Sequence, residues 1–250
     1  MTITQTAQRN LDAVFPNHEP TLKVSDPELV EIFANWAFDE VIADAPLDVR
    51  LRLMVQLASL IACQSVAEFR VMLGAALQAG VTPVEIKELL YQAVPYAGMA
   101  KVFDFLHTTN DVLQSRGITL PLEGQSTTTR DTRREKGLQV QKDLFGEQID
   151  QMYAKSPKDQ LHIQRYLSAN CFGDYLTRRG LDLKTRELLT LSMLASLGGC
   201  EAQLAGHVKG NLAAGNDRKM LISVITQLLP FIGYPRALNA LRVINEGAPK

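Results

Sequence analysis

The sequence repeats itself at a nearly constant spacing, and this internal repeat constrains the fold more than any other feature. Residues 47–52 (LDVRLR) correspond to residues 181–186 (LDLKTR) at a shift of 134 residues, and residues 38–40 fall on 172–174 at the same shift. Three further pairs lie 135 residues apart: Gly80 and Gly215, Pro95 and Pro230, and Gly98 and Gly233. Landmarks at so constant a shift predict two fused copies of one structural unit.

The periodicity of apolar residues indicates that both copies are helical. Apolar side chains recur three and four positions apart, as in Leu53, Leu57 and Leu60, whereas alternation of β-branched residues is almost absent. Residues 82–85 (TPVE) carry an N-cap, a proline at the first helical position and a capping-box glutamate. We therefore expect an all-α protein.

Glycines mark where helices are expected to end. Gly80 and Gly215 are placed to follow helix C-termini, with Asn216 or Asp217 able to cap the next helix. A further stop and start is expected at residues 233–235 (GYP).

Composition limits the classes of protein. The apolar fraction of 46% and the charged fraction of 21% are typical of a globular protein, and a net charge of −1 provides no overall basic field for nucleic acid or anionic membranes. Residues 1–10 are polar, and the most apolar windows, 51–63 and 220–232, are too short to span a bilayer. These features favour a cytoplasmic protein whose partner is a small-molecule substrate. The three cysteines form no CxxC pair and are expected to be reduced thiols.

Several segments of the second half resemble the carboxymuconolactone decarboxylase family. Residues 172–187 (FGDYLTRRGLDLKTRE) are similar to its signature segment, residues 206–215 (GHVKGNLAAG) to its histidine-bearing helix, and residues 136–146 to its opening segment. The resemblance covers about residues 136–241, and the first half resembles the same unit more weakly, through Arg52, Gly80 and residues 95–98.

This resemblance implies a fold and an assembly. The fold is a tandem duplication of an alkylhydroperoxidase-D-like helical unit, with residues 1–120 as a degenerate first unit, 121–136 as a Thr-rich linker and 137–250 as the second unit. Single-unit members of the family form helical rings, commonly hexamers. A fused pair is then expected to form a homotrimer that mimics a hexamer.

Relatives with thiol peroxidase activity carry a glutamate, a CxxC pair and a histidine that three residues separate from the second cysteine. Here Cys200 matches the first cysteine and His207 the histidine, but Gln203 occupies the second cysteine position. Glu187 is one residue away from the expected spacing. Without a resolving thiol the disulfide chemistry of that branch cannot run, whereas decarboxylation needs no disulfide.

We therefore expect His207, Glu187 and Cys200 to be catalytic and Arg186 to bind substrate. Cys200 follows two glycines, so it is expected in the first turn of a helix, where the macrodipole would lower the pKa of its thiol; the alternative is a small buried packing residue. The alternative role for Glu187 is a favourable interaction of its carboxylate with the helix dipole at the start of the helix. Arg52 is the counterpart of Arg186 in the first unit. The alternative role for Arg186 is therefore a structural one shared by both units, such as an ion pair between helices.

Chemistry is expected in the second unit alone, because the first unit offers Leu53, Ser65 and Met72 where the second has Glu187, Cys200 and His207. The four histidines, His18, His107, His162 and His207, show no metal-ligand spacing, and no cofactor motif appears.

The reaction implied by the resemblance is cofactor-independent decarboxylation of an unsaturated carboxy-lactone in aromatic catabolism. Three alternatives stay open: a peroxiredoxin-like thiol peroxidase that uses Cys200, a related decarboxylase or lactone isomerase with another substrate, and a non-catalytic helical oligomer.

Overall fold

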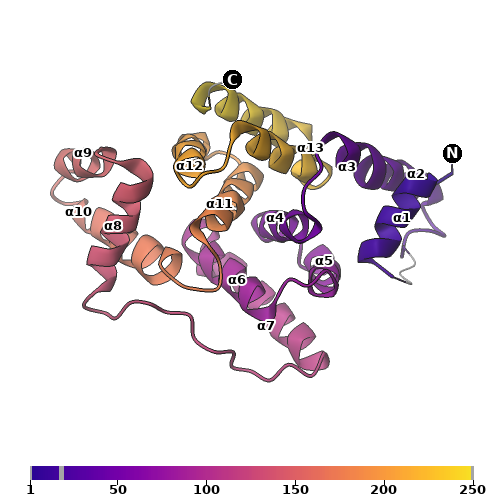
Figure 1. The fold of residues 1–250 in the computed structure, drawn as a ribbon, viewed down its shortest axis with the longest axis horizontal. Helices are drawn as coiled ribbons and strands as arrows, with labels where there is room; N and C mark the ends of the chain where they lie inside the picture. The colour runs from indigo at the N-terminus through magenta and orange to yellow at the C-terminus, as the bar shows by residue number, and fades with distance from the viewer. Residues whose placement is uncertain (1, 17–19, 249–250) are drawn as a thin grey trace.

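The computed structural model describes residues 2–16 and 20–248, and all regular secondary structure in these residues is helical (Figure 1). The all-α prediction is thus confirmed, while His18 lies outside the described residues. The elements are α1 (Gln5–Val14), α2 (Pro27–Asn35), the π-helix η1 (Trp36–Glu40), α3 (Val41–Asp44), α4 (Val49–Ala62), α5 (Val66–Gln78), α6 (Pro83–Ala97), α7 (Met99–Ser115), α8 (Arg133–Phe145), α9 (Gln148–Lys155), α10 (Leu161–Tyr166), the π-helix η2 (Leu167–Leu176), α11 (Leu183–Leu197), α12 (Glu201–Ala213) and α13 (Arg218–Gly247).

The backbone reproduces the sequence repeat. Helices α4, α5 and α6 correspond to α11, α12 and the first part of α13, and a π-helix precedes each set at the matching position. Gly80 and Gly215 both have positive φ, at 86° and 87°, as do Gly98 and Gly233, at 88° and 74°. Glycine tolerates such φ values without the steric cost that a Cβ would bring. The landmarks thus mark equivalent backbone turns in the two units.

The expected helix boundaries are also found. Thr82 and Glu85 form the capping box at the start of α6. In the second unit Asp217, rather than Asn216, caps the following helix by accepting a hydrogen bond from the amide of Met220 at 2.7 Å. The linker is shorter than expected, because α8 begins at Arg133 and so includes the last four residues of 121–136.

Among the helices that the structure describes, α13 is long enough and apolar enough to cross a membrane, judged by length and composition alone. Gly233 has non-helical dihedrals and divides it into two segments, each shorter than the roughly 20 residues that a bilayer needs. Its side chains Leu221, Val224 and Leu228 are buried in the core, which accounts for its apolar composition.

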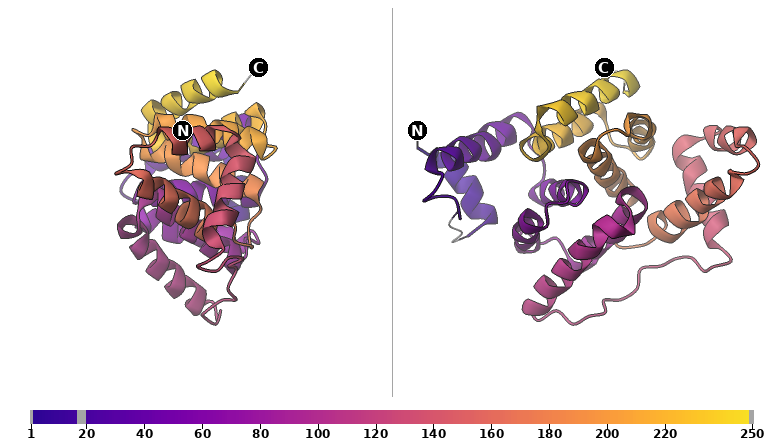
Figure 2. Two further views of the ribbon diagram at one scale, coloured as in Figure 1. Left: turned by 90° about the vertical axis from the view of Figure 1, so that its left-hand side faces the viewer. Right: turned by 180° about the vertical axis from the view of Figure 1, so that it is seen from behind.

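The core is centred on the two equivalent helices α4 and α11, which pack against each other (Figures 1 and 2). Their fully buried side chains include Leu57 and Leu191. At the contact the hydroxyl of Ser196 donates to that of Ser59 at 2.8 Å. The two units therefore share one continuous hydrophobic core.

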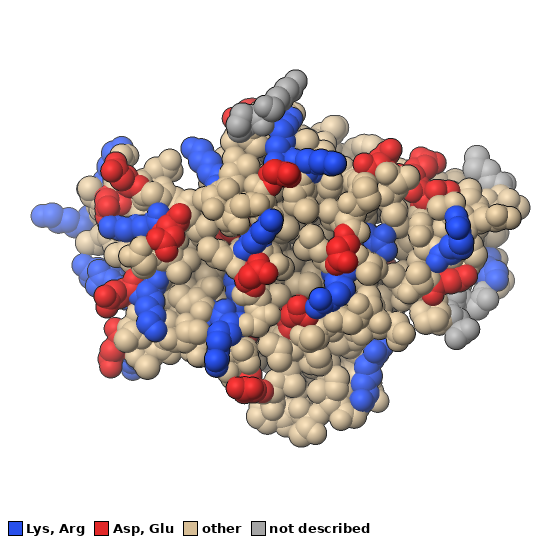
Figure 3. All heavy atoms as spheres, in the orientation of Figure 1, with Lys and Arg blue, Asp and Glu red and all other residues tan. Residues whose placement is uncertain are grey.

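The remaining helices lie at opposite ends of the molecule. Figure 1 shows α1–α3 at one end and α8–α10 with η2 at the other, and the linker runs beneath the core to connect α7 with α8. Helix α8 crosses η2 very closely, and glycine is needed at the crossing on both elements. A Cβ on Gly137 would lie 2.0 Å from the carbonyl oxygen of Ser168, and one on Gly173 would lie 2.0 Å from that of Arg133. On the face shown in Figure 3, cationic and anionic side chains are interspersed.

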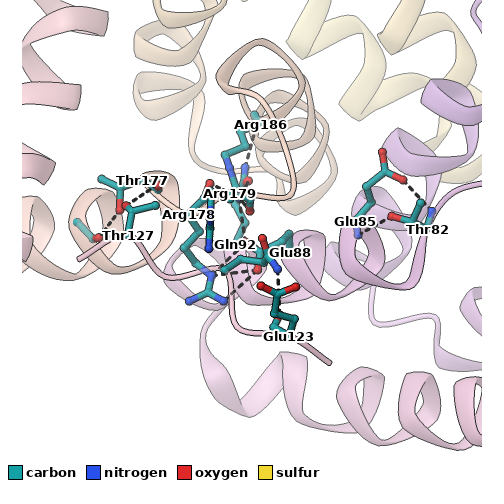
Figure 4. A network of polar contacts seen from close by, with 12 residues as sticks. Thr82, Glu85, Glu88, Gln92, Glu123, Thr127, Thr177, Arg178, Arg179 and Arg186 are labelled. Atoms are coloured by element: carbon teal, nitrogen blue, oxygen red, sulfur yellow. Dashed lines mark hydrogen bonds and ion pairs between the residues drawn. The ribbon is translucent and has the colours of Figure 1, made fainter. Parts of the chain in front are cut away.

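A buried ion-pair network joins the two units (Figure 4). Glu88 of α6 is 1% exposed and accepts hydrogen bonds from Nε of Arg178 at 3.0 Å and from Nη2 of Arg186 at 2.9 Å. Arg186 also donates to the side-chain oxygen of Gln92 at 3.1 Å. Burial lowers the pKa of Arg186, and the neighbouring Glu88 acts in the opposite direction. The carboxylate of the first unit thereby neutralises guanidinium groups of the second.

We predict that Glu88→Gln lowers the free energy of unfolding by about 3–5 kcal/mol, because it leaves buried guanidinium charge without its partner. The matched control is Glu246→Gln, whose carboxylate is 63% exposed and pairs with Arg242 on the surface. That change should cost less than about 1 kcal/mol. Urea denaturation of both variants measures the difference, and equal midpoints would contradict the structural role of Glu88.

Candidate active site

The candidate site is built on a buried hydrogen bond between α11 and α12. Nδ1 of His207 lies 2.9 Å from Oε2 of Glu187. Glu187 is fully buried and His207 is 9% exposed. An ionised carboxylate only accepts hydrogen bonds, so in that state Nδ1 carries a hydrogen and Nε2 is left to exchange a proton. The structure therefore brings together two of the expected catalytic residues.

Two asparagines hold this pair in place. The side-chain amide of Asn211 donates to the backbone carbonyls of Glu187 at 3.0 Å and His207 at 2.8 Å. Asn216 in turn donates to Oδ1 of Asn211 at 2.9 Å and to the carbonyl of Lys184 at 3.0 Å. Because these bonds connect the first turns of α11 to α12 and to the residue Asn216 that follows it, they limit the movement of the pair.

Aromatic rings from two other helices surround the imidazole. The ring of Phe145, at the end of α8, lies 5.7 Å from that of His207, and the ring of Tyr96 lies 5.5 Å away, both edge-on. Tyr96 belongs to α6 and so to the first unit. The site therefore lies where the two units meet, while His207 and Glu187 both belong to the second unit.

One buried polar atom of this pair, Oε1 of Glu187, has no hydrogen-bond partner among the described residues. Burial raises the pKa of Tyr96 well above its ordinary value, and the charges of Cys171 and Glu187 add to this effect, while a hydrogen bond to the side chain of Thr190 acts in the opposite direction. Burial likewise raises the pKa of the Cys171 thiol to about 12. At neutral pH Tyr96 is therefore a neutral hydrogen-bond donor within the electrostatic reach of Glu187, whose Oε1 has unused acceptor capacity.

A glycine makes room for the carboxylate. A Cβ on Gly210 of α12 would lie 2.6 Å from Oε2 of Glu187 and 3.1 Å from Cε1 of Phe145. Gly206, one turn earlier on the same helix, has no atom within 4 Å of the corresponding position. Gly210 is thus required for the approach of Glu187 to His207.

Cys200 occupies a different environment from the one expected. It is the N-cap residue of α12 rather than part of its first turn, and its thiol donates to the carbonyl oxygen of Leu194 at 3.2 Å. Its pKa is raised by burial and by the neighbouring carboxylate of Glu201. The raised pKa differs from the expected lowering, because burial and the carboxylate of Glu201 both disfavour the thiolate.

The structure also separates Cys200 from the histidine. Cys200 lines a cavity of about 50 Å³ together with Leu204 and Arg236, and neither His207 nor Glu187 lines that cavity. Cys63 and Cys171, expected to be packing residues, both lie in apolar clusters.

Arg186 is engaged in the ion-pair network rather than open to a ligand. Its side chain is 1% exposed, and it also donates to the carbonyls of Arg178 and Arg179 at 3.0 and 3.1 Å. This geometry agrees with the structural alternative for Arg186 and not with substrate binding. Among the described residues, no three His, Cys, Asp or Glu side chains cluster as metal ligands would.

Sequence reasoning missed Tyr96, Phe145 and Asn211 as parts of the site. Asn211 follows His207 by four residues, a spacing that places both on one face of a helix and could have indicated their contact. Tyr96 was noted only as part of a segment shared with the family. No local signal reveals its contact with His207, because 111 positions separate the two residues.

Comparison with known proteins agrees with this architecture. The model of the carboxymuconolactone decarboxylase family matches the chain twice, at residues 27–111 and 162–246, which begin 135 residues apart. The chain therefore belongs to the carboxymuconolactone decarboxylase family, as two fused units. The resemblance of both halves of the sequence to this family is confirmed.

One curated relative is an uncharacterized 15.0 kDa protein in the nqo9-nqo10 intergenic region of Paracoccus denitrificans. It is 38% identical to this chain over 73 residues, which are 29% of the chain and 54% of that protein. The match thus spans about half the length of that relative.

We predict opposite effects for two glycine substitutions in α12. Gly206→Ala should keep or raise stability, by up to about 1 kcal/mol, because alanine favours helix and meets no neighbour. Gly210→Ala should destabilise by about 1–3 kcal/mol, because its Cβ displaces Glu187 or shifts the helix. Thermal unfolding followed by circular dichroism measures both, and equal melting temperatures would contradict the close packing.

We also predict that Cys200 is slow to react at neutral pH. Its raised pKa leaves a smaller fraction of thiolate at pH 7 than in an ordinary thiol, and its alkylation rate should keep rising above pH 9.0, the ordinary pKa. Iodoacetamide labelling of the native protein, followed by peptide mass spectrometry across pH 6–10, measures this rate. Faster labelling than N-acetylcysteine at pH 7 would contradict it.

Proposed function

We propose that this chain is a cofactor-independent decarboxylase of the 4-carboxymuconolactone decarboxylase type, acting on an unsaturated carboxy-lactone in aromatic catabolism. The observation that carries the proposal is the buried Glu187–His207 pair, in which Oε1 of Glu187 has no hydrogen-bond partner among the described residues and the ring of Tyr96 packs against the imidazole. An unsatisfied carboxylate oxygen at a buried acid–base pair is typical of a site that completes its hydrogen bonds with substrate.

The chemistry needs few groups from the protein. When the C–C bond to the departing CO₂ breaks, its electron pair passes through the ring alkene into the lactone carbonyl and forms a dienolate. The protein has to stabilise the negative oxygen and deliver one proton to carbon. The neutral hydroxyl of Tyr96 is our proposed donor to that oxygen, since its raised pKa keeps its proton in place at neutral pH.

His207 is the proposed proton donor. With Nδ1 bonded to Glu187, the protonated imidazole releases its Nε2 proton to the dienolate carbon and returns to the neutral form. The hydrogen bond between Glu187 and Nδ1 fixes the orientation of the ring. Solvent then restores the proton, so that one CO₂ leaves and one proton enters in each turnover.

The thiol peroxidase alternative has less support. It requires an activated thiolate, but the pKa of Cys200 is raised and its thiol is bonded to a backbone carbonyl. Cys171 lies closer to the site, and burial raises the pKa of its thiol to about 12. For both cysteines burial disfavours the thiolate that this reaction requires.

We predict that His207→Ala lowers the turnover of 4-carboxymuconolactone by about 10²–10⁴, the range for a positioned acid or base. Tyr96→Phe should lower it by about 10²–10³, the usual loss for one oxyanion donor. Glu187→Gln should also lower it, whereas the matched control Cys200→Ser should stay near the unsubstituted rate. Spectrophotometric loss of the lactone measures each rate.

Each variant is first checked for unchanged helicity and assembly. Full activity in His207→Ala would refute the site assignment. Loss of activity in Cys200→Ser alone, together with hydroperoxide reduction by the unsubstituted protein, would place the protein in the thiol class.

We further propose that the chain forms a homotrimer. Leu29 and Ile32 of α2 and Tyr234 and Leu238 of α13 are exposed, and the ring of Trp36 in η1 stacks on that of Tyr234 with centroids 6.0 Å apart. Exposed large apolar side chains are typical of a subunit interface.

Light scattering should therefore give the mass of three chains, and Leu238→Glu should shift the protein toward monomer because it places a charge in the apolar contact. The matched control is Val71→Glu, on an exposed position of α5. A stable monomer at micromolar concentration would contradict this proposal.

A further inference from the structure

A cavity of about 330 Å³ lies apart from the His207 site, between α6 and the linker. Its floor is one face of α6, where Val84, Lys87 and Tyr91 follow at helical spacing. The linker segment 120–125 covers it, and Arg178 lies at one end. Neither His207 nor Glu187 lines it. Its volume is within the range of small-molecule sites.

Lys87 lines this cavity without an ion-pair partner in the described part of the chain. Its ammonium group donates to Oδ1 of Asn110, and among the described residues no carboxylate lies within ion-pair distance of it. Burial lowers the pKa of Lys87, because nothing nearby compensates the charge. A lysine in this state gains stability from any anion that reaches it.

The other charged side chains that line the cavity do not pair with Lys87. They are Arg178, Glu88 and Glu123, which with Lys87 make two cations and two carboxylates. Glu88 is already shared between Arg178 and Arg186. Glu123, labelled in Figure 4, is exposed on the linker, where solvent and salt screen its charge. An anion placed beside Lys87 would therefore supply the ion-pair partner that this lysine lacks.

The linker is tied down where it closes the cavity. The carbonyl of Gln125 accepts a hydrogen bond from the amide of Arg179 at 2.9 Å, and the hydroxyl of Thr127 donates to the carbonyl of Thr177 at 2.8 Å. Gly180 lets the chain after Arg179 approach α6, since a Cβ there would lie 2.9 Å from side-chain atoms of Val84 and Glu88. These bonds fix the linker side of the cavity.

We infer that this cavity is a second binding site, which takes a small organic monocarboxylate. The carboxylate pairs with Lys87 near Asn110, and the apolar body lies between Val84 and Leu122 beside the ring of Tyr91. The guanidinium of Arg178 already lies over that ring, 5.2 Å from its centre, so the ring and Arg178 form one rigid wall. This site stands independently of the proposed decarboxylase activity.

The test is isothermal titration calorimetry of the full-length protein with benzoate and hexanoate as probes. We expect saturable binding of one molecule per chain, with a dissociation constant on the order of 1 mM for so small a ligand. Lys87→Met, which keeps the length of the side chain and removes its charge, should weaken binding at least about tenfold. Lys101→Met on the exposed part of α7 is the matched control and should bind as the unsubstituted protein does.

Neutral benzamide should show no saturable binding, because it cannot supply the missing charge. A second measurement uses the unsubstituted protein: benzoate should slow acetylation of Lys87, as read by peptide mass spectrometry. In a separate titration, His207→Ala should leave benzoate affinity unchanged. Absence of saturable binding of both carboxylates, equal affinity in Lys87→Met, or protection of other lysines instead of Lys87 would overturn the inference.

Discussion

The site depends on the buried network in which Arg186 of the second unit meets Glu88 of the first. Gln92, one turn further along α6, extends this contact by donating to the carbonyl of Arg186 at 2.7 Å and to the hydroxyl of Thr190 at 2.9 Å. These bonds fix the start of α11 against α6. Tyr96 lies one further turn along α6, so the same contact sets the position of its ring beside His207.

The two units share a backbone but not a set of polar residues. Gln92 and Gln227 occupy equivalent positions and are both buried. Each side chain donates to backbone carbonyls of the other unit. Glu88, in contrast, has Ser223 as its counterpart. The duplication therefore provides a symmetric scaffold, whereas the ion-pair network and the Glu187–His207 pair occur once.

The sequence was sufficient for the architecture because the features that define it are local. Positive-φ glycines such as Gly80 and Gly215, the capping box at Thr82 and the apolar periodicity each act within a few residues. They recur in both units, which made the duplication visible without any knowledge of contacts.

The site was predicted only in part, because its environment depends on contacts distant in sequence. The Glu187–His207 pair followed from the family segments, but the approach of Tyr96 depends on how α6 packs against the second unit. The pKa of Cys200 was expected in the wrong direction, since its burial and its bond to Leu194 depend on tertiary structure. Arg186 likewise needed the position of Glu88 before its structural role could be recognised.

The central claim is that this buried pair delivers a proton to carbon as CO₂ leaves. The most direct measurement is the reaction of the purified protein with 4-carboxymuconolactone in D₂O, followed by mass spectrometry and NMR of the product. The account predicts equimolar CO₂ and enol-lactone, with one deuterium on the ring carbon that receives the proton. Absence of CO₂ release, or release with no deuterium on carbon, would contradict it.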